Sequence, residues 1–530
     1  MTSPDSPAAH SDALVDAVER TRKSYDQTPY SSTPHIRLHP GRMAANARWM
    51  GLAGPDAATG RVLEIGCASG GHILPLAAAM PAARFLGVDL SPVQIEAGRK
   101  RLASLGLTNI ELRAQSFEEI GAADGVFEFI ICHGVYSWIP EPLRDALLRV
   151  IRERLTPEGV AMVSFNVLPG WRVFQVARDA MMLNARFLAD PTTRAERTRE
   201  LFGLLAEKSL DKYTYGQFWR HEAKRMAAGG DAYLAHEIFE EDNAPETFIG
   251  FTDRIVRHEL IYLSECALAA NNEDSMVPEG AASIRALARG DELAREQYID
   301  IFSGRAFREA LIVRSARADA IRLAPSLESL ESFHFIPGID LEIRPAPDAE
   351  DHFIVADDGG GVTIRGAAVA ESIGRLIARL PRSSRIEDLA AEDDEGRLRA
   401  NVLKALTALV VYGHCAVSTL PVECAVTLAE RPKAWRVAAN DARDSDTTAS
   451  LRHASVRLEP LQRLFLPMLD GTRTRDDLVA HAIELAERDV LHLNGPEGRI
   501  TGREALASRL GPATDRCLAC LLRIGLLVEG

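Results

Sequence analysis

Residues 61–91, RVLEIGCASGGHILPLAAAMPAARFLGVDLS, constrain the fold more than any other stretch of the chain. Positions 61–65 are largely apolar, as in strands that helices cover on both faces. A glycine-rich turn over 66–71 follows at once, and a second strand over 84–89 ends in the carboxylate of Asp89. A strand, a glycine turn, a helix and an acid-terminated strand are typical of a doubly wound, Rossmann-like α/β sheet. We therefore expect an α/β fold with a ligand site at this turn.

The glycine turn is a candidate binding site because its backbone is accessible. Glycines let the chain bend sharply and let a ligand approach the main chain without a Cβ in the way. A helix that begins near Gly71 would also point free N–H groups at a carboxylate or a phosphate. The pattern Gly66-x-Ala68-x-x-Gly71 satisfies a loose dinucleotide motif as well. The glycines alone therefore leave open an NAD-binding sheet and a sheet that binds no nucleotide.

Two features favour one cofactor. Glu64 lies two residues before the first glycine, and the second strand and its helix have the sequence GVDLSPVQIEAGRKRL. Together they resemble class I S-adenosylmethionine (AdoMet) methyltransferases, whose acid-x-Gly-x-Gly-x-Gly loop faces the methionine part of AdoMet. Ala68 stands where the middle glycine is usual, and Ser116 or Gln115 stands where related enzymes often hold an acid against adenine. The resemblance implies AdoMet as the cofactor, bound by these residues: Glu64, Gly66, Ala68, Gly70, Gly71, Asp89, Leu90, Ser116 and Phe117.

Three further strands are expected in the same sheet, over 109–114, 127–132 and 160–165. The strand 127–132 continues into HGVYSWIP, and the strand 160–165 continues into NVLPGW. Ligands in such sheets bind outside the carboxyl ends of the strands, so both loops are expected to border the transferred methyl group. The candidate catalytic residues in these loops are His133, Tyr136, Trp138 and Asn166.

Methyl transfer from a sulfonium is an in-line displacement, in which alignment matters more than acid or base strength. An amine acceptor must arrive without its proton, and the unperturbed pKa of lysine is about 10.4. An apolar channel and the nearby sulfonium favour loss of that proton. We expect Tyr136, Trp138 and Trp171 to wall such a channel, because aromatic faces suit a cationic amine. His133 is expected to orient the acceptor or help its proton leave, and Asn166 offers an amide carbonyl. Packing at the rim of the sheet is the alternative role for each.

Several further sequence motifs restrict the resemblance to a smaller family. YDxxPYxS, HPxR, LEIGCASGG, HGVYSWIP and VSFNVLPGW occur in this order, and AHEIF, EQYID and RxFR follow. They resemble the bacterial methyltransferases that carry a methyltransferase regulatory domain, over about residues 20–315. That family includes protein-lysine methyltransferases that act on outer-membrane proteins, so the resemblance implies a protein lysine as acceptor. None of the motifs is specific for a lysine acceptor. Two alternatives stay open: a small-molecule N- or O-methyltransferase, and an interaction protein that senses AdoMet without catalysing methyl transfer.

Helical periodicity dominates residues 172–320, and we interpret this part as an all-helical inserted module. The expected helices span 176–188, 194–208, 218–227, 247–259, 281–287, 292–302 and 307–313. His236-Glu237 is half of a zinc motif, but no second histidine follows at helical spacing. A structural helix is therefore the favoured interpretation there.

An internal repeat organises the C-terminal part. LIxxLP, IEDL and LxxLxxxG over 376–413 recur as FLxxLD, RDDL and LxxLxxxG over 465–525. Each copy predicts a winged-helix-like unit of helices that run into a short strand, in an α+β region. The stretches that would contact DNA in such units are acidic, so contact with a protein is favoured.

The expected domains are an N-terminal arm or lid that begins as a mobile tail (1–60), an AdoMet-binding domain (61–171), a helical regulatory domain (172–320), and the two repeat units (321–420 and 421–530).

The composition disfavours several classes of function. The formal net charge is −14, and no basic run with interleaved aromatic residues occurs, which argues against nucleic acid as a partner. No apolar stretch reaches the roughly 18 residues of a membrane span, and no secretory signal pattern is seen. The scattered cysteines, with Cys517-x-x-Cys520 as the one close pair, are expected to be reduced core thiols. We expect a cytoplasmic protein with a protein substrate, and the large helical and repeated parts also suggest a homodimer.

Overall fold

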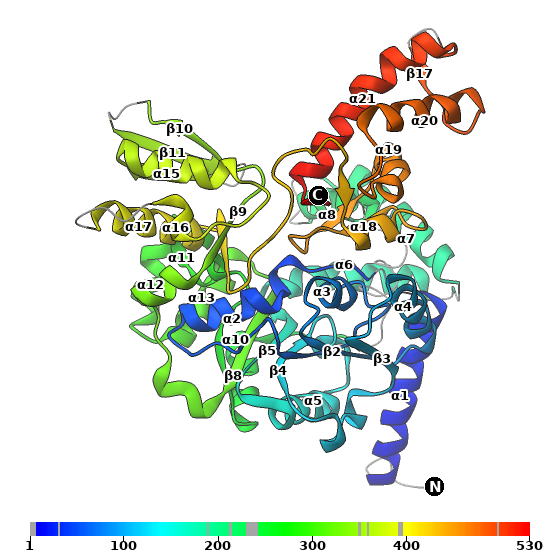
Figure 1. Cartoon of the computed structure of the whole chain (residues 1–530). Coiled ribbons are helices and arrows are strands. Elements are labelled where there is room, and N and C mark those ends of the chain that lie inside the picture. The colour runs from blue at the N-terminus through cyan, green and yellow to red at the C-terminus, as the bar shows by residue number, and fades with distance from the viewer. Residues whose placement is uncertain are drawn as a thin grey trace.

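A mixed sheet of eight strands forms the centre of the molecule, in the order β3-β2-β1-β4-β5-β8-β7 with β6 beside β5 (Figure 1). The computed structural model describes residues 7–29, 32–186, 188, 190–210, 215–228, 242–347, 351–357, 360–390, 396–495 and 498–530. The strands of the sheet are β1 (Arg61–Ile65), β2 (Arg84–Asp89), β3 (Ile110–Ala114), β4 (Phe127–Cys132), β5 (Leu155–Leu168), β6 (Glu246–Thr247), β7 (Leu260–Glu265) and β8 (Phe307–Arg314). The strands from β3 to β5 are parallel, whereas β8 and β7 are antiparallel to their neighbours. The expected α/β class is confirmed.

Helices cover both faces of this sheet, as its apolar strands require. Those of the first 332 residues are α1 (Pro7–Gln27), α2 (Pro40–Trp49), α3 (Ile73–Ala79), α4 (Pro92–Leu105), α5 (Glu141–Arg154), α6 (Gly170–Ala185), α7 (Pro191–Lys208), α8 (Gly216–Ala228), α10 (Phe248–Arg257), α11 (Glu273–Met276), α12 (Ala281–Ala288), α13 (Glu292–Ser303) and α14 (Leu327–Ser332). On one face, α2, α3 and α4 share an apolar cluster with Val62 of β1. On the other face, α5 and α10 share a cluster with Leu63, because successive strand residues point to opposite sides.

The parallel half of the sheet agrees closely with the sequence expectations. β2 and β4 have the predicted bounds, and Ser91 caps α4 by accepting a hydrogen bond from the backbone N–H of Gln94. The helix after the glycine turn begins at Ile73, two residues after Gly71, and has 7 residues. One expectation is wrong. Residues 7–20, expected to be a mobile tail, belong to α1, in which Arg22 pairs with Glu19 and Asp26 at helical spacing.

The antiparallel half of the sheet comes from the region that was expected to be all helical. Residues 307–313, predicted as a helix, form β8, and residues 260–265 form β7. β8 has 6 consecutive buried residues because helices cover both faces of the sheet at that point. Its apolar part, residues 310–313, is short and continuous, and such a run does not distinguish a strand from a buried helix. The other expected helices of this region are present with small shifts at their ends, whereas the motif at 235–239, with His236 and Glu237, lies outside the described residues.

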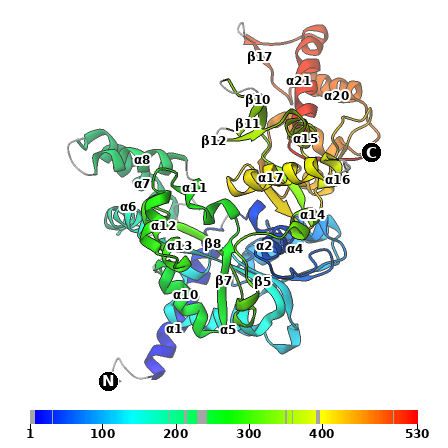
Figure 2. The same ribbon diagram turned by 90° about the vertical axis from the view of Figure 1, so that its left-hand side faces the viewer.

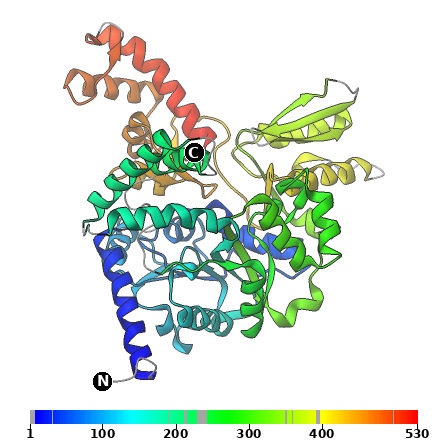
Figure 3. The ribbon, with the colours of Figure 1, turned by 180° about the vertical axis from the view of Figure 1, so that it is seen from behind.

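Two C-terminal units rise side by side above the sheet, and α6 to α8 form a separate layer (Figures 1, 2 and 3). The first unit contains β9 (His334–Pro337), β10 (Glu342–Pro345), β11 (His352–Asp357), β12 (Gly360–Arg365), α15 (Ala367–Ala378), α16 (Ile386–Leu389), α17 (Arg397–Val411) and β13 (Cys415–Ser418). The second contains β14 (Lys433–Ala434), α18 (Arg436–Asp441), β15 (Thr447–Ala449), β16 (Ser455–Arg457), α19 (Pro460–Phe465), α20 (Arg475–Glu487), β17 (Asn494–Gly495), β18 (Gly498–Arg499), α21 (Arg503–Arg523) and β19 (Leu527–Val528). The order α15-α16-α17-β13 corresponds to α19-α20-α21-β19, as the sequence repeat predicts.

The cysteines are unpaired, and Cys520 is exposed whereas the others are buried. Among the helices that the structure describes, none combines the length and the apolar character that crossing a bilayer requires.

A buried ionic network fastens the antiparallel strands to α13. Arg308 of β8 is fully buried; its Nη1 lies 2.6 Å from Glu265 Oε1 and 3.1 Å from Glu296 Oε2, and its Nη2 lies 2.9 Å from Asp300 Oδ1. Its guanidinium also lies 4.0 Å from the ring centre of Phe248. Burial raises the pKa of Asp300 to about 7, although Arg308 opposes that shift. The Arg308 guanidinium therefore contacts three buried carboxyl groups, and Arg305 and Arg295 add positive charge beside them.

We expect Arg308→Met to lower the free energy of unfolding by about 3–5 kcal/mol, since removing one partner of a buried ion pair leaves uncompensated charge. Urea denaturation followed by circular dichroism measures the change. Arg285→Met is the matched control, because Arg285 pairs with Glu273 and Asp274 with 48% of its side chain exposed. Equal shifts in the two variants would contradict the prediction.

Candidate active site

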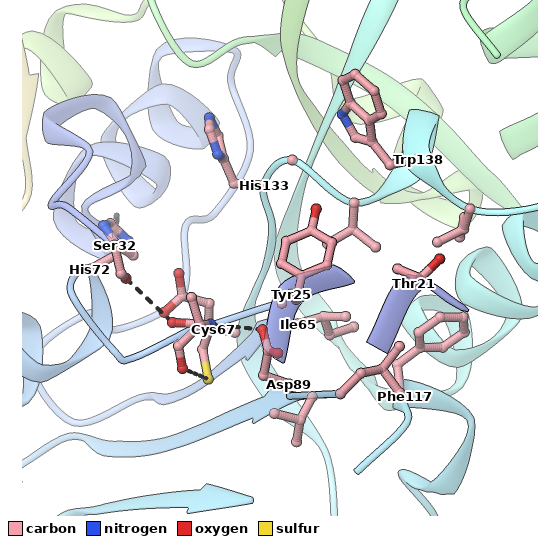
Figure 4. A pocket seen from close by; sticks show the side chains of 18 of the residues that line it. Thr21, Tyr25, Ser32, Ile65, Cys67, His72, Asp89, Phe117, His133 and Trp138 are labelled. Atoms are coloured by element: carbon pink, nitrogen blue, oxygen red, sulfur yellow. Dashed lines mark hydrogen bonds between the residues drawn. The ribbon is translucent and has the colours of Figure 1, made fainter. Parts of the chain in front are cut away.

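A cavity lies at the carboxyl ends of β1, β2 and β4, where the sequence places the ligand (Figure 4). The glycine turn, the end of β2 and the turn after β3 form one side of it. The loop after β4, the N-terminal arm and the start of β8 form the other. In Figure 4, Asp89 and Phe117 lie on one side of this space, and His133 and Trp138 lie on the opposite side. The cavity thus has two halves, of which the first corresponds to the predicted cofactor site.

Asp89 fixes the shape of the glycine turn. Its Oδ2 accepts the backbone N–H of Ala68 at 2.8 Å, and its Oδ1 accepts the backbone N–H of Ser91 at 2.9 Å. Ala68 has a left-handed backbone with φ of 48°, a conformation that glycine adopts more easily. The first bond therefore stabilises an alanine where a glycine is usual. Gly66 cannot be replaced in this way, because its φ is 77° and a Cβ there would lie 2.5 Å from Val135 Cγ2.

The last two glycines of the turn shape it without lining the cavity. Gly70 has a φ of 74°, which allows the chain to turn into α3. The backbone N–H of Gly71 donates to Ser32 Oγ at 2.7 Å, and a Cβ on Gly71 would lie 1.9 Å from the carbonyl oxygen of Ser32. This N–H is thus already used by the N-terminal arm. The predicted role of Gly71 as a free donor to a ligand is not supported by this geometry.

Glu64 provides a buried acid in the wall of the cavity. The residue is 5% exposed, and its Oε2 has no hydrogen-bond partner among the residues that the structure describes. Burial, with a contribution from Asp89, raises the pKa of the Glu64 carboxyl well above its usual value. A buried carboxylate without a partner is unfavourable, so a positively charged ligand group in the cavity would stabilise it. The ammonium of AdoMet fits this requirement.

The segment after β3 contributes differently from the expectation. Gln115 and Phe117 line the cavity together with Leu90. Ser116, predicted to contact adenine, instead accepts the backbone N–H of Glu118 through Oγ and caps the short helix Phe117–Glu119. Ser116 is not among the described residues that line the cavity. In this segment, Gln115 is therefore the polar side chain that can contact the adenine of the cofactor.

The loop after β4 places two of its predicted residues in the cavity and turns a third away. His133 and Trp138 line the cavity. Tyr136, expected in the channel wall, is fully buried beneath it, and its hydroxyl donates to Glu246 Oε2 at 3.1 Å. The guanidinium of Arg144 lies 5.2 Å from the centre of the Tyr136 ring. Tyr136 therefore anchors the loop and does not contact a ligand in this arrangement.

Asn166 and Trp171 lie behind the cavity wall. Asn166 is 1% exposed, its backbone N–H donates to Ser137 Oγ at 2.9 Å, and it pairs with Phe307 across β5 and β8. Trp171 packs edge-on against Trp138, with 6.2 Å between ring centres, and its Nε1 donates to Asn243 Oδ1. Both residues hold the loop that carries Trp138.

The lining of the cavity contains further residues that sequence reasoning missed. Thr21 and Tyr25 reach the cavity from α1, and His35, His72 and Phe307 complete its wall. The motif YDxxPYxS, which includes Tyr25, was the one sequence feature that could have indicated these residues. Nothing in the local pattern of 307–314 indicates a cavity, because its side chains reach the site only through the pairing of β8 with β5.

His133 lies in a polar part of the wall, beside His35 and the ion pair of Arg37 with Glu309. Its ring lies 4.1 Å from the ring of His35, and its Nε2 lies 3.7 Å from Glu309 Oε1, which Arg37 holds from the other side. Burial, with help from His35 and Arg37, lowers the pKa of His133 to about 3, and burial lowers that of His35 to about 4. Both imidazoles are neutral near pH 7. Within the described ranges, no group of three or more His, Cys, Asp or Glu side chains is arranged to hold a metal ion.

Comparison with known proteins agrees with this geometry. Three family models match the chain: a methyltransferase domain over residues 62–159, a predicted methyltransferase regulatory domain over 230–314, and the C-terminal winged helix domain of PKMT over 430–526. The fold, the acid-glycine turn and the first match define a class I AdoMet-dependent methyltransferase, with AdoMet as its cofactor. The chain belongs to the family of these enzymes that carries a methyltransferase regulatory domain and a PKMT-type winged-helix domain.

Relatives cover most of the chain. The uncharacterized protein RP789 of Rickettsia prowazekii (strain Madrid E) is 26% identical over 504 residues, which cover 92% of this chain and 90% of that protein. RP028 of the same organism is 33% identical over 240 residues, which cover 45% of this chain and 96% of that protein. The structure of PKMT2 from Rickettsia typhi in complex with AdoHcy has a TM-score of 0.83, covers 94% of this chain and 100% of its own, and is 24% identical. This last likeness supports the fold.

We expect AdoMet to bind more tightly as the pH rises through the range in which Glu64 ionises. Burial raises the pKa of its carboxyl in the free enzyme, and a cationic ligand favours the carboxylate, so binding releases a proton wherever the free carboxyl is still protonated. Calorimetry in two buffers of different ionisation enthalpy measures that release. Glu64→Gln should abolish it and weaken binding about 10- to 100-fold, as expected for a charged hydrogen bond of about 1.5–3 kcal/mol.

Glu111→Gln is the control for this measurement, since Glu111 lies on β3 with 60% of its side chain exposed and pairs with Arg113. It should leave both the affinity and the proton release unchanged. Proton release that persists in Glu64→Gln would assign the ionisation to another group.

Proposed function

We propose that the chain is a protein-lysine N-methyltransferase. The observation that carries the proposal is the acceptor half of the cavity, in which Trp138 and Phe307 provide aromatic surface beside the neutral imidazole of His133. An aromatic wall with a neutral imidazole suits an amine that must lose its proton before it reacts. The PKMT-type domain over 430–526 and the name of the similar structure, PKMT2, also favour a protein lysine.

Different residues of the cavity bind the cofactor and orient the acceptor. AdoMet supplies a methyl group on a positively charged sulfur. Glu64 and Asp89 hold the cofactor end of the cavity. Trp138 and Phe307 confine the acceptor side chain, so that its nitrogen forms a bond to the methyl carbon as the carbon–sulfur bond breaks and the electron pair stays on sulfur. His133 accepts a hydrogen bond from the acceptor nitrogen, because its neutral ring keeps a lone pair.

The size of the protein favours a macromolecular acceptor. Residues 172–530, which follow the expected AdoMet-binding domain, make up more than half of the chain, and a small acceptor would not require them. The proposal includes a protein substrate, a cytoplasmic location and a homodimer, and light scattering of the purified enzyme tests the last of these.

The acceptor is tested by incubating the enzyme with methyl-labelled AdoMet and a lysate of its own host. We expect label in discrete protein bands that survives mild base, which removes methyl esters, and methyl-lysine after hydrolysis of those bands. Label confined to small molecules would contradict the proposal in favour of a small-molecule N- or O-methyltransferase. Absence of label while AdoMet binds would favour the sensing role.

The aromatic wall is tested separately with two variants of Trp138. We expect Trp138→Ala to lower kcat/KM for the labelled acceptor at least about tenfold, because it removes a face that a cationic amine contacts. Trp138→Phe keeps an aromatic face and should lose less than about threefold. Both should bind AdoMet within about twofold of the wild type, since Trp138 lies on the acceptor side. An equal loss in both variants would argue against aromatic recognition.

A further inference from the structure

The second C-terminal unit is docked on the AdoMet-binding sheet. Asp441 of α18 accepts two hydrogen bonds from the guanidinium of Arg101 in α4, each 2.8 Å long, and it is 6% exposed. Trp435, Val437 and Ala449 share one apolar cluster with α3 and α4. A unit held by a buried ion pair and a common core is part of the same folded body. Its side chains can therefore act on the active site through direct contact.

His453 makes such a contact from the turn between β15 and β16. It is 3% exposed, and its Nε2 lies 2.9 Å from Nδ1 of His72, which lines the cavity. Its backbone is left-handed, with φ of 61°, and the turn is closed by hydrogen bonds from His453 N to Ser450 O and from Ser450 N to Ala454 O. A left-handed residue other than glycine is uncommon and costs free energy, so a retained one calls for a compensating role.

The direction of this hydrogen bond follows from a second one. Nδ1 of His72 also accepts the backbone N–H of His35 at 3.1 Å. A ring nitrogen that accepts a backbone N–H carries no proton, so Nε2 of His453 must be the donor. Burial keeps the pKa of both histidines well below the usual value, with further lowering from neighbouring His35, His39, His133 and Arg42. Both rings are neutral, and each has one defined tautomer.

The contacts continue from His72 to the acceptor half of the cavity. The His35 backbone that His72 holds carries the imidazole that lies 4.1 Å from the ring of His133. His453 thus acts at one end of a continuous set of contacts, with His133 at the other. Loss of the His453 donor would remove one of the two contacts that orient the His72 ring, and that ring holds the His35 backbone whose imidazole packs against His133.

We propose that His453 is a positioning residue for methyl transfer, through which the second winged-helix unit fixes the orientation of His72, His35 and His133 in the active-site wall. The inference rests on the placement of His133 beside the acceptor, which belongs to the proposed function. It does not depend on whether the acceptor is a protein lysine.

Two amide variants separate this role from a structural one. Glutamine places its amide nitrogen close to the position of Nε2 in histidine and keeps the donor to His72, whereas asparagine is too short to do so. Asparagine is, however, the better residue for a left-handed backbone. We expect His453→Gln to keep kcat within about threefold, and His453→Asn to lower kcat about 10- to 100-fold with AdoMet affinity and melting temperature unchanged. A purely structural role predicts the opposite order.

The kcat is measured on whichever acceptor takes label in the assay described above, protein or small molecule, so failure of the lysine proposal leaves this test intact. Nitrogen-15 spectra of the histidine rings provide a readout without an acceptor, and we expect the Nδ1 signal of His72 to shift in His453→Asn but to stay close to its wild-type position in His453→Gln. His492→Gln is the control, because this histidine of the same unit is 59% exposed. Wild-type kcat in His453→Asn, or a loss of kcat that matches a loss of melting temperature, would overturn the proposal.

Discussion

The carboxylate of Asp89 is the interaction on which the rest of the site depends. Its oxygens accept the backbone N–H groups of Ala68 and Ser91, so one side chain ties the glycine turn to the start of α4. Burial raises the pKa of Asp89, and these two bonds oppose the shift. Each carboxylate oxygen can accept more than one hydrogen bond, so Asp89 can meet ribose hydroxyls while it holds the turn. Structural and binding roles therefore coincide in one residue.

The same turn determines where the N-terminal arm lies. Because Gly71 has no side chain, Ser32 approaches its backbone closely and takes its N–H. The arm then brings His35 and Tyr25 over the cavity, and Asp26 accepts a hydrogen bond from the Ser91 hydroxyl at 2.6 Å. The arm is thus attached to both ends of the segment that Asp89 organises. The wall opposite the cofactor follows from the geometry of the turn.

The sequence predicted the cofactor half of the site and little of the acceptor half, for a physical reason. Glu64, Gly66 and Asp89 lie in one strand-turn-helix-strand unit, whose local signals fix both fold and position. Phe307 reaches the cavity only through the pairing of β8 with β5, and its apolar neighbours resemble a buried helix as much as a strand. The position of a residue in a loop does not determine the direction of its side chain either. Tyr136 points into the core because its buried hydroxyl donates a hydrogen bond to Glu246.

The docked winged-helix unit changes how regulation can work in this enzyme. A tethered module would influence the site only by bringing a partner near, whereas this unit shares a core with α3 and α4 and reaches a cavity-lining histidine. A partner that binds the unit would therefore act by a small displacement of the turn that carries His453, which the tight packing of the interior transmits. The first unit lies against α2 instead, where the N–H of Thr419 donates to the carbonyl of Gly41. Since α2 follows directly on the arm, the first unit contacts a segment next to the one that carries His35. The second unit contacts His72, which follows the glycine turn, and packs on α3 and α4, which flank that turn. Displacement of the C-terminal half would then act on both halves of the cavity, the acceptor side through the arm and the cofactor side through the glycine turn.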